Sequence, residues 1–521
     1  MKKHLGIVVV FIVFSLCTTQ GYAQQKENLP VYKEILYIKN LYAGSQNPSA
    51  LFFSPIDQVL DFNLNYGIDR GDLHPIDRSS KANQLGVDIT GRHRFKKVIC
   101  YGDISYINQK EYDRRWNSTL YLSPDNPFIL GDTIPSDFST EKFNLTGTVA
   151  YSPDNRFIAA LRLNYKTGSS ANQTDPRPRT DGMHFTINPG VNYTFNKHIA
   201  LGISGEVKLF NESITHLIVD PRESYVYFRF NGMGDFSSIS TGISQSYPRD
   251  YKGTEYKGAL QFTWQDKRRF SNLFEIFYAS NSEDARDGGT AFTFLGGDYT
   301  RKIFGIKDRF RITGEHYTHN ITLAYTHKTV KGIWYEQTQY LDPDKNNQLA
   351  YKVQTSGLKH KENAAVVDLH YRLDRINNEI PTFTFFVNGN LVNSTIKHIE
   401  GEGYKQEYTQ LTANAGISKY FLFGRNHITA TLDGTGSLPF SSKLQAMPRL
   451  AEIYTTPAFE YTTASTFSGH IRLDYRRQFQ AFWIGLYADA SLKCYSGNNK
   501  YTDALKNTNY KTFTIGANIL F

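Results

Sequence analysis

Cysteine is scarce in this chain. The 521 residues contain 3 cysteines, and one of them, Cys17, lies in an apolar stretch near the start. The other two, Cys100 and Cys494, allow one disulfide at most, and the sequence leaves open whether they pair. A small scaffold held together by several disulfides is therefore excluded.

Long hydrophobic runs are also missing. After Ala23, no stretch approaches the ~18 consecutive apolar residues that a transmembrane helix needs, and the mean hydropathy is −0.45. If this protein is in a membrane, it must cross as strands. The formal net charge of +9 comes without a nucleic-acid-binding motif. We therefore assign the charge to turns, rims and a lumen, and expect no nucleic-acid partner.

Catalytic motifs are absent as well. The chain has neither a Gly-x-Ser-x-Gly nucleophile elbow nor a His-Glu-x-x-His metal-binding helix. His316 and His319 would lie on opposite faces of a strand, which is poor geometry for one metal ion. We predict no catalytic residue, no cofactor and no metal site, while an outer-membrane enzyme stays open as an alternative.

Residues 1–23 have the form of a secretory signal peptide. Two lysines precede an apolar run, and small residues occupy the −3 and −1 positions before a cleavage site at Gln24. The alternative is a lipoprotein anchored at Cys17, but that would require a small residue where the chain has Leu16. We expect export through the inner membrane and removal of the leader.

Aromatic residues are abundant, with 35 Tyr and 36 Phe. Many aromatics on a polar chain suit a membrane barrel with aromatic girdles and a wet interior. They suit an array of soluble β-sandwiches as well, so composition alone does not decide between the two.

The last ten residues, 512–521, alternate strictly between apolar and small or polar side chains and stop on a phenylalanine. This stretch resembles the closing strand of bacterial outer-membrane β-barrels. The resemblance implies that the barrel-assembly machinery reads the terminal aromatic strand during biogenesis. The residues that would form this assembly signal are Phe513, Ile515, Ile519 and Phe521.

Short and long connections alternate along the chain. Short connections at one end and long ones at the other are typical of outer-membrane barrels, with the short turns in the periplasm. Eight short turns and both termini on that side predict an all-β, antiparallel transmembrane barrel of about 18 strands; 16 is an alternative, within a range of 14 to 20. The turns lie at Lys96-Lys97, Pro153–Arg156, Asn196–His198, Asp266–Arg269, Gly305–Asp308, Asp374–Pro381, Phe423–Asn426 and Gln478–Gln480.

Charged side chains recur on one phase of the predicted strands, whereas the other phase is apolar. A charge that faces lipid costs about 2–4 kcal/mol at the bilayer midplane, so these residues are expected to face a lumen. They could cross-link the wall through ion pairs or line a mildly basic, water-filled path; in a soluble sandwich they would lie on an open outer face. The set is Asp88, Arg92, Arg94, Arg162, Glu206, Lys208, Arg309, Arg311, Glu315, Asp368, His370, Arg372, Arg472, Asp474 and Arg476.

Residues 24–58 precede the barrel, which we assign to 59–521. They are too short for the plug domain of a TonB-dependent receptor. Gln46-Asn47-Pro48-Ser49-Ala50-Leu51 is similar to the N-P-A-x-L element of fatty-acid-channel-type barrels, in which the amino-terminal segment enters the lumen. The alternative is a periplasmic turn that leads into the first strand.

The loop at 111–135 combines Pro and Gly punctuation with apolar residues that need burial. It is similar to the constriction loop of porins, and the alternative is a surface loop packed on its neighbour. Its candidate residues are Arg114, Arg115, Trp116, Phe128 and Asp132.

Taken together, the leader ending in Y-A-Q-Q and the Tyr/Phe/Asn-rich strands resemble an uncharacterised single-barrel family of the Bacteroidota outer membrane. We predict a porin-like channel or uptake component for a small solute, in contact with membrane lipid and lipopolysaccharide. The resemblance also implies an alternative, a closed accessory barrel that serves as a platform for a surface lipoprotein or a TonB-dependent receptor.

Overall fold

The computed structural model describes residues 29–220, 222–241, 247–266, 269–288, 293–378, 380–399, 403–497, 500–501 and 503–521. The predicted signal peptide lies outside these residues. No helix in the described part of the chain has the length and apolar character needed to cross a membrane.

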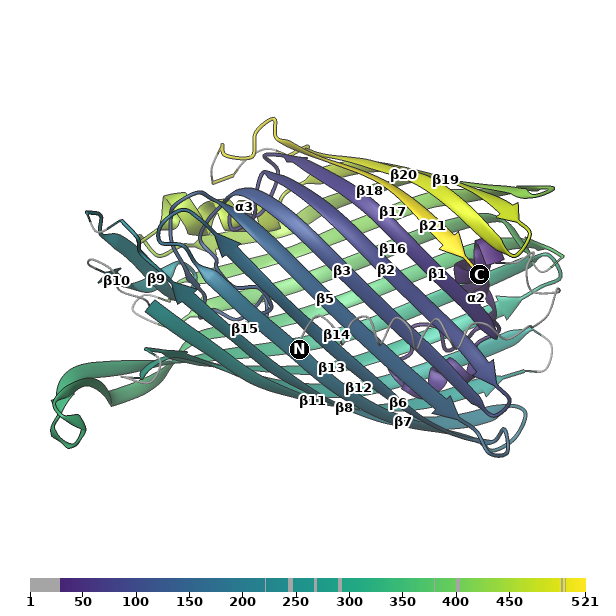
Figure 1. Cartoon of the computed structure of the whole chain (residues 1–521), viewed down its shortest axis with the longest axis horizontal. Helices are drawn as coiled ribbons and strands as arrows, with labels where there is room; N and C mark the ends of the chain where they lie inside the picture. Colours follow the sequence, from purple (N-terminus) through teal and green to yellow (C-terminus); the bar gives the residue numbers. More distant parts are fainter. Residues whose placement is uncertain are drawn as a thin grey trace.

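The chain forms a closed antiparallel barrel of 18 strands, as predicted (Figure 1). Each strand pairs with its neighbour in sequence, and β1 closes the barrel by pairing with β21, from Asp61 opposite Leu520 to Gly71 opposite Tyr510. The strands are β1 (Gln58–Gly71), β2 (Lys81–Phe95), β3 (Val98–Arg114), β5 (Ser136–Tyr151), β6 (Phe157–Asn172), β7 (Arg179–Thr194), β8 (Ile199–His216), β11 (Tyr247–Gln265), β12 (Phe270–Asp287), β13 (Phe294–Thr313), β14 (Tyr317–Asp342), β15 (Gln348–Asn377), β16 (Ile380–His398), β17 (Lys405–Phe423), β18 (Asn426–Gln445), β19 (Thr466–Phe479), β20 (Phe482–Tyr495) and β21 (Asn509–Leu520).

Alternate residues of every strand point outward. The outer surface of the barrel is apolar because these outward residues are mostly apolar. Leu64, Leu161 and Ile203 are among the exposed apolar side chains at mid-strand. Aromatic side chains gather near the short turns, as in the girdle of an outer-membrane barrel. This belt includes Phe95, Tyr151, Phe157, Tyr193, Phe195, Trp264, Tyr317, Phe421, Phe423, Phe479 and Phe521. The architecture is that of an outer-membrane barrel.

One predicted turn is wrong. Gly305–Asp308 lies inside β13, and the chain turns instead at 314–316, between β13 and β14. Glycine at position 305 makes room for the Phe277 ring on the neighbouring strand, because a Cβ there would lie 2.2 Å from that ring. The other short turns lie within two residues of the predicted positions, so the error did not change the strand count.

The long connections at the opposite end carry most of the structure outside the barrel. They contain a small sheet of β4 (Leu130–Gly131), β9 (Tyr225–Gly232) and β10 (Asp235–Thr241), and the helical turns η4 (Ala451–Thr455) and α3 (Thr456–Thr462). The connection at 331–363 is mainly strand: β14 and β15 pair as far as Asp342 and Gln348, joined by η3 (Pro343–Lys345). Figure 1 shows this hairpin projecting beyond the barrel rim.

Residues 29–57, which we call the lumenal segment, lie inside the barrel at the end with the short turns. They form α2 (Tyr32–Lys39) and the 3-10 helix η2 (Pro48–Phe53). The segment lies inside, because it contacts strands from all round the wall, including β1, β7, β13 and β19. The fold thus places the start of the chain across its own lumen.

Candidate functional site

The lumenal segment closes the short-turn mouth with an apolar seal. Leu29, Val31, Tyr32 and Ile35 pack against the inner ends of the strands, where each is less than a tenth exposed. Their partners on the wall are Val59, Tyr420, Trp483 and Leu520. Burial of such side chains is worth about 1.5–3 kcal/mol each, so hydrophobic contact holds the lumenal segment to the wall at this end.

Beyond the apolar seal, the contacts between the wall and the lumenal segment are polar: cationic side chains of the wall donate to main-chain carbonyl oxygens of the segment. Arg309 donates to the carbonyl oxygens of Ala43 at 2.6 Å and Tyr37 at 3.0 Å, and Arg311 donates to that of Lys39 at 2.7 Å. The neighbouring inward residue of β13, Lys307, bonds to a carbonyl of the same segment at 2.9 Å. The carbonyls at the end of α2 carry the negative end of the helix dipole, so they are favourable partners for cations.

Arginines of β2 and β19 also donate hydrogen bonds to main-chain carbonyl oxygens of the segment. Arg94 donates to the carbonyl oxygens of Phe52 and Ser54 at 2.8 and 3.1 Å, and Arg476 donates to that of Pro30. The wall therefore grips the segment from several directions through its main chain.

Asn47 anchors the segment to the wall at β7 and β8. Its side-chain amide donates to the carbonyl oxygens of Val191 at 2.9 Å and Ile203 at 3.2 Å, and the residue is fully buried. The approach is close because the wall has glycines there: a Cβ on Gly190 would lie 2.1 Å from Asn47 Oδ1. Asn47 also caps η2 by accepting from the N–H of Ser49. The predicted N-P-A-x-L-like element thus lies in the lumen.

The structure places the predicted lumen charges as follows. Arg92, Arg94, Arg309, Arg311 and Arg476 contact the lumenal segment. Other members of the set bond to wall residues: Lys208 to Glu255, Asp88 to Asn63, Asp368 to Asn390, His370 to Asn388, and Arg372 and Arg472 each to an aspartate two residues on, Asp374 and Asp474. Arg162 makes one weak bond to Thr148, and Glu206 lies on the inward phase of β8 beside it.

Glu315 is a correction. It lies exposed in the turn between β13 and β14 and not on a strand. The prediction failed because the turn had been placed at 305–308, which put residue 315 in the middle of a strand.

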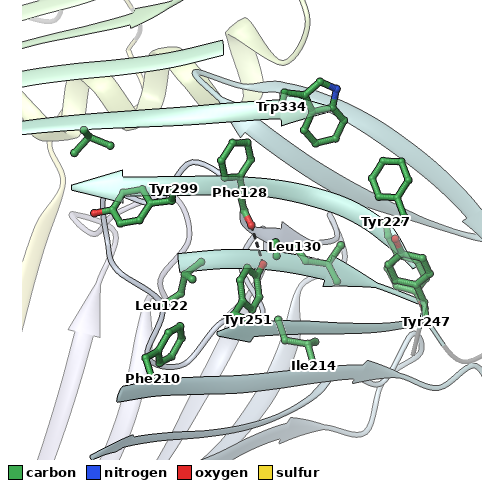
Figure 2. Close-up of a cluster of buried hydrophobic side chains, with 13 residues drawn as sticks. Leu122, Phe128, Leu130, Phe210, Ile214, Tyr227, Tyr247, Tyr251, Tyr299 and Trp334 are labelled. Carbon is green, nitrogen blue, oxygen red and sulfur yellow. Dashed lines mark hydrogen bonds between the residues drawn. The ribbon is translucent and has the colours of Figure 1, made fainter. Parts of the chain in front are cut away.

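At the other mouth, the loop at 115–135, which we call the inward loop, packs against the inside of the wall. Phe128 is completely buried, among inward side chains of β8 and of β11 to β14 (Figure 2). The Tyr251 hydroxyl donates to the carbonyl oxygen of Phe128 at 2.8 Å. Arg249 reaches the same oxygen at 3.3 Å while it forms an ion pair with Asp287, and both members of the pair are 0% exposed. The loop is therefore built into the lumen.

Carboxylates hold the rest of the inward loop. Glu212 of β8 accepts from the main-chain N–H groups of Leu120 and Tyr121, and Glu283 of β12 accepts from the Ser123 hydroxyl at 2.5 Å. Asp125 of the loop binds Lys328 at 2.9 Å. Although burial raises the pKa of Asp125, the Lys328 ammonium and the Tyr299 hydroxyl outweigh it and lower that pKa below its ordinary value.

The predicted constriction residues divide into buried and exposed members. Arg114 is buried at the base of the loop, in an ion pair with Glu111 at 3.1 Å, and Arg115 is exposed. Trp116 packs on aromatic side chains of neighbouring loops, and burial raises the pKa of Asp132 to about 6. Among the described residues, neither Arg114 nor Arg115 contacts the strands on the opposite side of the barrel.

The remaining long loops cover the inward loop. Trp116 contacts Tyr454 with ring centroids 5.1 Å apart, and Thr455 donates to the carbonyl oxygen of Met233 at 3.1 Å. The hairpin of β9 and β10 reaches the wall through a contact of 3.1 Å between the Asp235 carboxylate and the His398 imidazole. Three of the long loops thus contact one another at this end of the barrel.

Cavities lined in part by charged and polar side chains lie inside the described part of the barrel. One of about 570 Å³ separates the lumenal segment from β2, β3, β5 and β6, and one of about 340 Å³ adjoins β1, β2 and β19 to β21. A third, of about 280 Å³, lies beneath the extracellular loops beside His360. An apolar recess of about 510 Å³ over β6–β8, β11 and β12 faces outward and belongs to the lipid contact surface.

Sequence analysis missed several inward residues. Arg249, Asp287 and His470 lie on the inward phase, and His470 bridges Asp433 at 2.6 Å and Asp489 at 3.0 Å. The strand phase could have identified His470, because it alternates with the apolar residue Ile471 before the predicted Arg472. The burial of Arg249 had no such signal, because it depends on the distant inward loop.

Within the described ranges, no group of three or more His, Cys, Asp or Glu side chains is arranged to hold a metal ion. Cys100 and Cys494 are free cysteines.

One protein-family model, that of a family of unknown function (DUF6850), matches residues 48–521. No curated protein matches the chain. Among solved structures, the chain is similar to the copper transporter OprC (10% identity, TM-score 0.39, covering 90% of this chain and 81% of that one). It is also similar to the RagAB peptide importer in its closed-closed state (8%, 0.40, 90% and 87%) and to a Pseudomonas aeruginosa FadL homologue (10%, 0.32, 95% and 97%).

Proposed function

The chain belongs to the DUF6850 family, whose function is unknown, and we propose from its own geometry that it is a gated outer-membrane conduit for a small polar solute. The lumenal segment would be the gate on the periplasmic side, and the inward loop would narrow the path on the outer side. The solute would enter through the long-loop mouth and cross a polar, mildly basic lumen.

The observation that carries the proposal is the chemistry of the contact between segment and wall. Arginines of three strands hold the segment through carbonyl oxygens, and polar cavities remain beside it. Side chains fill the interior of a barrel of about 8 strands, whereas a barrel of 18 strands leaves room for a path, and here the segment occupies part of that room. Open space beside a hydrogen-bonded segment supports a gate.

The gate could move without unfolding the barrel. The wall begins at Gln58 and closes through the pairing of β1 with β21, so the segment contributes no strand to it. Displacement would expose the apolar seal and free the wall cations, and it would leave the sheet complete.

Single-channel recording in planar bilayers tests this proposal. The intact protein should be silent or open in brief events, whereas deletion of 24–55 should give steady conductance. Matched detergent-purified samples, each shown to be folded by heat-modifiable migration on gels, provide the control. Silence of both folded proteins would contradict the conduit.

The contacts among the long loops favour a second candidate, a platform for a surface partner. Contacts such as Trp116 on Tyr454 and Thr455 on Met233 order the outer loops into one surface. A surface lipoprotein or a TonB-dependent receptor would be the partner. A stable partner that co-purifies from the native membrane, together with the absence of conductance, would favour this role.

A further inference from the structure

We propose that the cavity of about 570 Å³ between the lumenal segment and the wall is a binding site for a small oxyanion, a carboxylate or a phosphate. This inference deepens the proposed function and rests on it where it concerns transport. Cavities of about 300–1,000 Å³ are the usual size for small-molecule sites.

The charge of the lining carries the inference. Arg92, Arg162 and Lys166 line the cavity, and its lining includes no aspartate or glutamate. Among the described residues, none of these three cations forms an ion pair with a carboxylate. Glu206 acts on Arg162 through space but is outside the lining. Charges in a partly buried site are normally paired. Three cations without a carboxylate partner therefore favour binding of an anion from solution.

The cations are held by neutral groups that leave donors free. Arg92 donates from Nη1 to the Ser54 hydroxyl at 2.7 Å, and its Nε is buried without a partner. Arg162 has one long bond, from Nε to the Thr148 hydroxyl at 3.4 Å. A guanidinium offers five N–H donors in a fork that matches a carboxylate or a phosphate. The two arginines therefore retain the donors that an oxyanion needs.

The neighbouring cavity of about 340 Å³ shows that a cation surplus is not general in this lumen. Lys33 and two arginines line it, but so do Asp61, Asp88 and Asp103. Its charges can neutralise one another within the wall, as Lys33 and Asp61 do at 3.0 Å. Of these two cavities, the one on the β2–β6 side has cations in its lining without a carboxylate beside them.

The site also touches the gate. Residues Asn40 and 42–45 of the lumenal segment form part of the lining. An anion that binds more tightly once the segment has moved would shift the population toward the open state by its difference in affinity. The same solute would then be both cargo and opener.

Isothermal titration calorimetry of the full-length, detergent-purified protein tests the site with two separate probes, sodium phosphate and sodium succinate. The test variant is Arg162→Gln with Lys166→Gln. Lys166→Gln alone is a second variant, because the Lys166 ammonium makes no hydrogen bond or ion pair with another described residue. Lys257→Gln is the control, since Lys257 faces the lumen over the Phe277 ring and does not line the cavity.

We expect saturable binding of at least one probe, with the affinity lowered about tenfold or more in the double variant and less in Lys166→Gln, as the loss of a charge-assisted partner predicts. Lys257→Gln should bind as the wild type does. The preferred probe identifies the anion class. Absence of binding by both probes, or equal affinity in wild type and Lys166→Gln, would overturn the site. Binding by a protein whose deletion variant is silent in bilayers would overturn the conduit and support the site.

Discussion

Arg309 of β13 and Ala43 of the lumenal segment are joined by a hydrogen bond of 2.6 Å from the arginine Nη1 to the alanine carbonyl oxygen. The arginine is 2% exposed and has no carboxylate partner among the described residues. A buried cation satisfied by main-chain oxygens depends on the segment as much as the segment depends on it. This reciprocity is what makes the gate testable.

Replacement of Arg309 and Arg311 by Gln should loosen the lumenal segment. Hydrogen bonds from charged groups are worth about 1.5–3 kcal/mol each, so we expect trypsin to cut after Lys39 at least about tenfold faster in the folded variant. Lys257→Gln is the matched control, because it removes a lumen cation that does not bind the segment. Unchanged cleavage in the double variant would show that the apolar seal holds the segment by itself.

The change Gly190→Ala should displace Asn47. The new methyl group would lie 2.1 Å from Asn47 Oδ1, against a buried side chain with two bonds to the wall. Loss of those two bonds costs about 1–3 kcal/mol in total, and hydrogen exchange should quicken at residues 46–53. Gly147→Ala is the control, since a Cβ there meets nothing within 4 Å. Equal exchange in the two variants would contradict the anchor.

Asp287→Asn should destabilise the folded barrel by about 3–5 kcal/mol, because it leaves the fully buried Arg249 without its counter-charge. Urea unfolding in lipid vesicles measures the change. The neighbouring variant Asp284→Asn is the control: its partner Arg286 is 3.2 Å away and both are about a third exposed, so the loss should stay below about 1 kcal/mol. Similar losses in both variants would mean that burial of the Arg249 pair contributes little.

The inward loop should become less stable as the pH rises. Burial raises the pKa of Asp132 to about 6 in the folded protein, above the ordinary value of about 3.9. The folded state therefore binds more protons between these values, so stability is greatest below about pH 4 and is lost as the pH rises through about 6. The change is on the order of 3 kcal/mol.

Hydrogen exchange at residues 116–134 measures this effect. Exchange should be slower at pH 4 than at pH 7 after correction for the intrinsic rate, and Asp132→Asn should remove the difference, because the amide oxygen can still accept from the Ile134 N–H. The exposed Asp113 gives the control variant Asp113→Asn. A pH response that survives Asp132→Asn would assign it to another group.

The barrel could be predicted because its signal is local. Period-two alternation and the spacing of turns are read within a few residues of each other, and they gave the strand number. The failure at Gly305 has the same origin: a glycine beside a charged pair resembles a turn locally, whereas its contact is with Phe277 on the neighbouring strand. That contact cannot be read from one stretch of sequence.

The site was less predictable because it depends on residues far apart in the chain. Arg309 was recognised as inward-facing, but its partner Ala43 lies 266 positions earlier and contributes only a carbonyl oxygen. The burial of Arg249 likewise follows from Phe128 and not from its own strand. Periodicity gives the face of the wall on which a residue lies, and it does not give what occupies the lumen beside it.

The grip of the wall on main-chain oxygens has a consequence for how this sequence can change over time. Every peptide unit carries the same carbonyl group, so Ala43, Tyr37 and Lys39 could be exchanged for other residues without removing an acceptor from Arg309 or Arg311. The arginines have no such freedom. Natural variants should therefore accumulate in the middle of the lumenal segment, while Asn47, which binds through its side chain, and the cations facing the segment tolerate few.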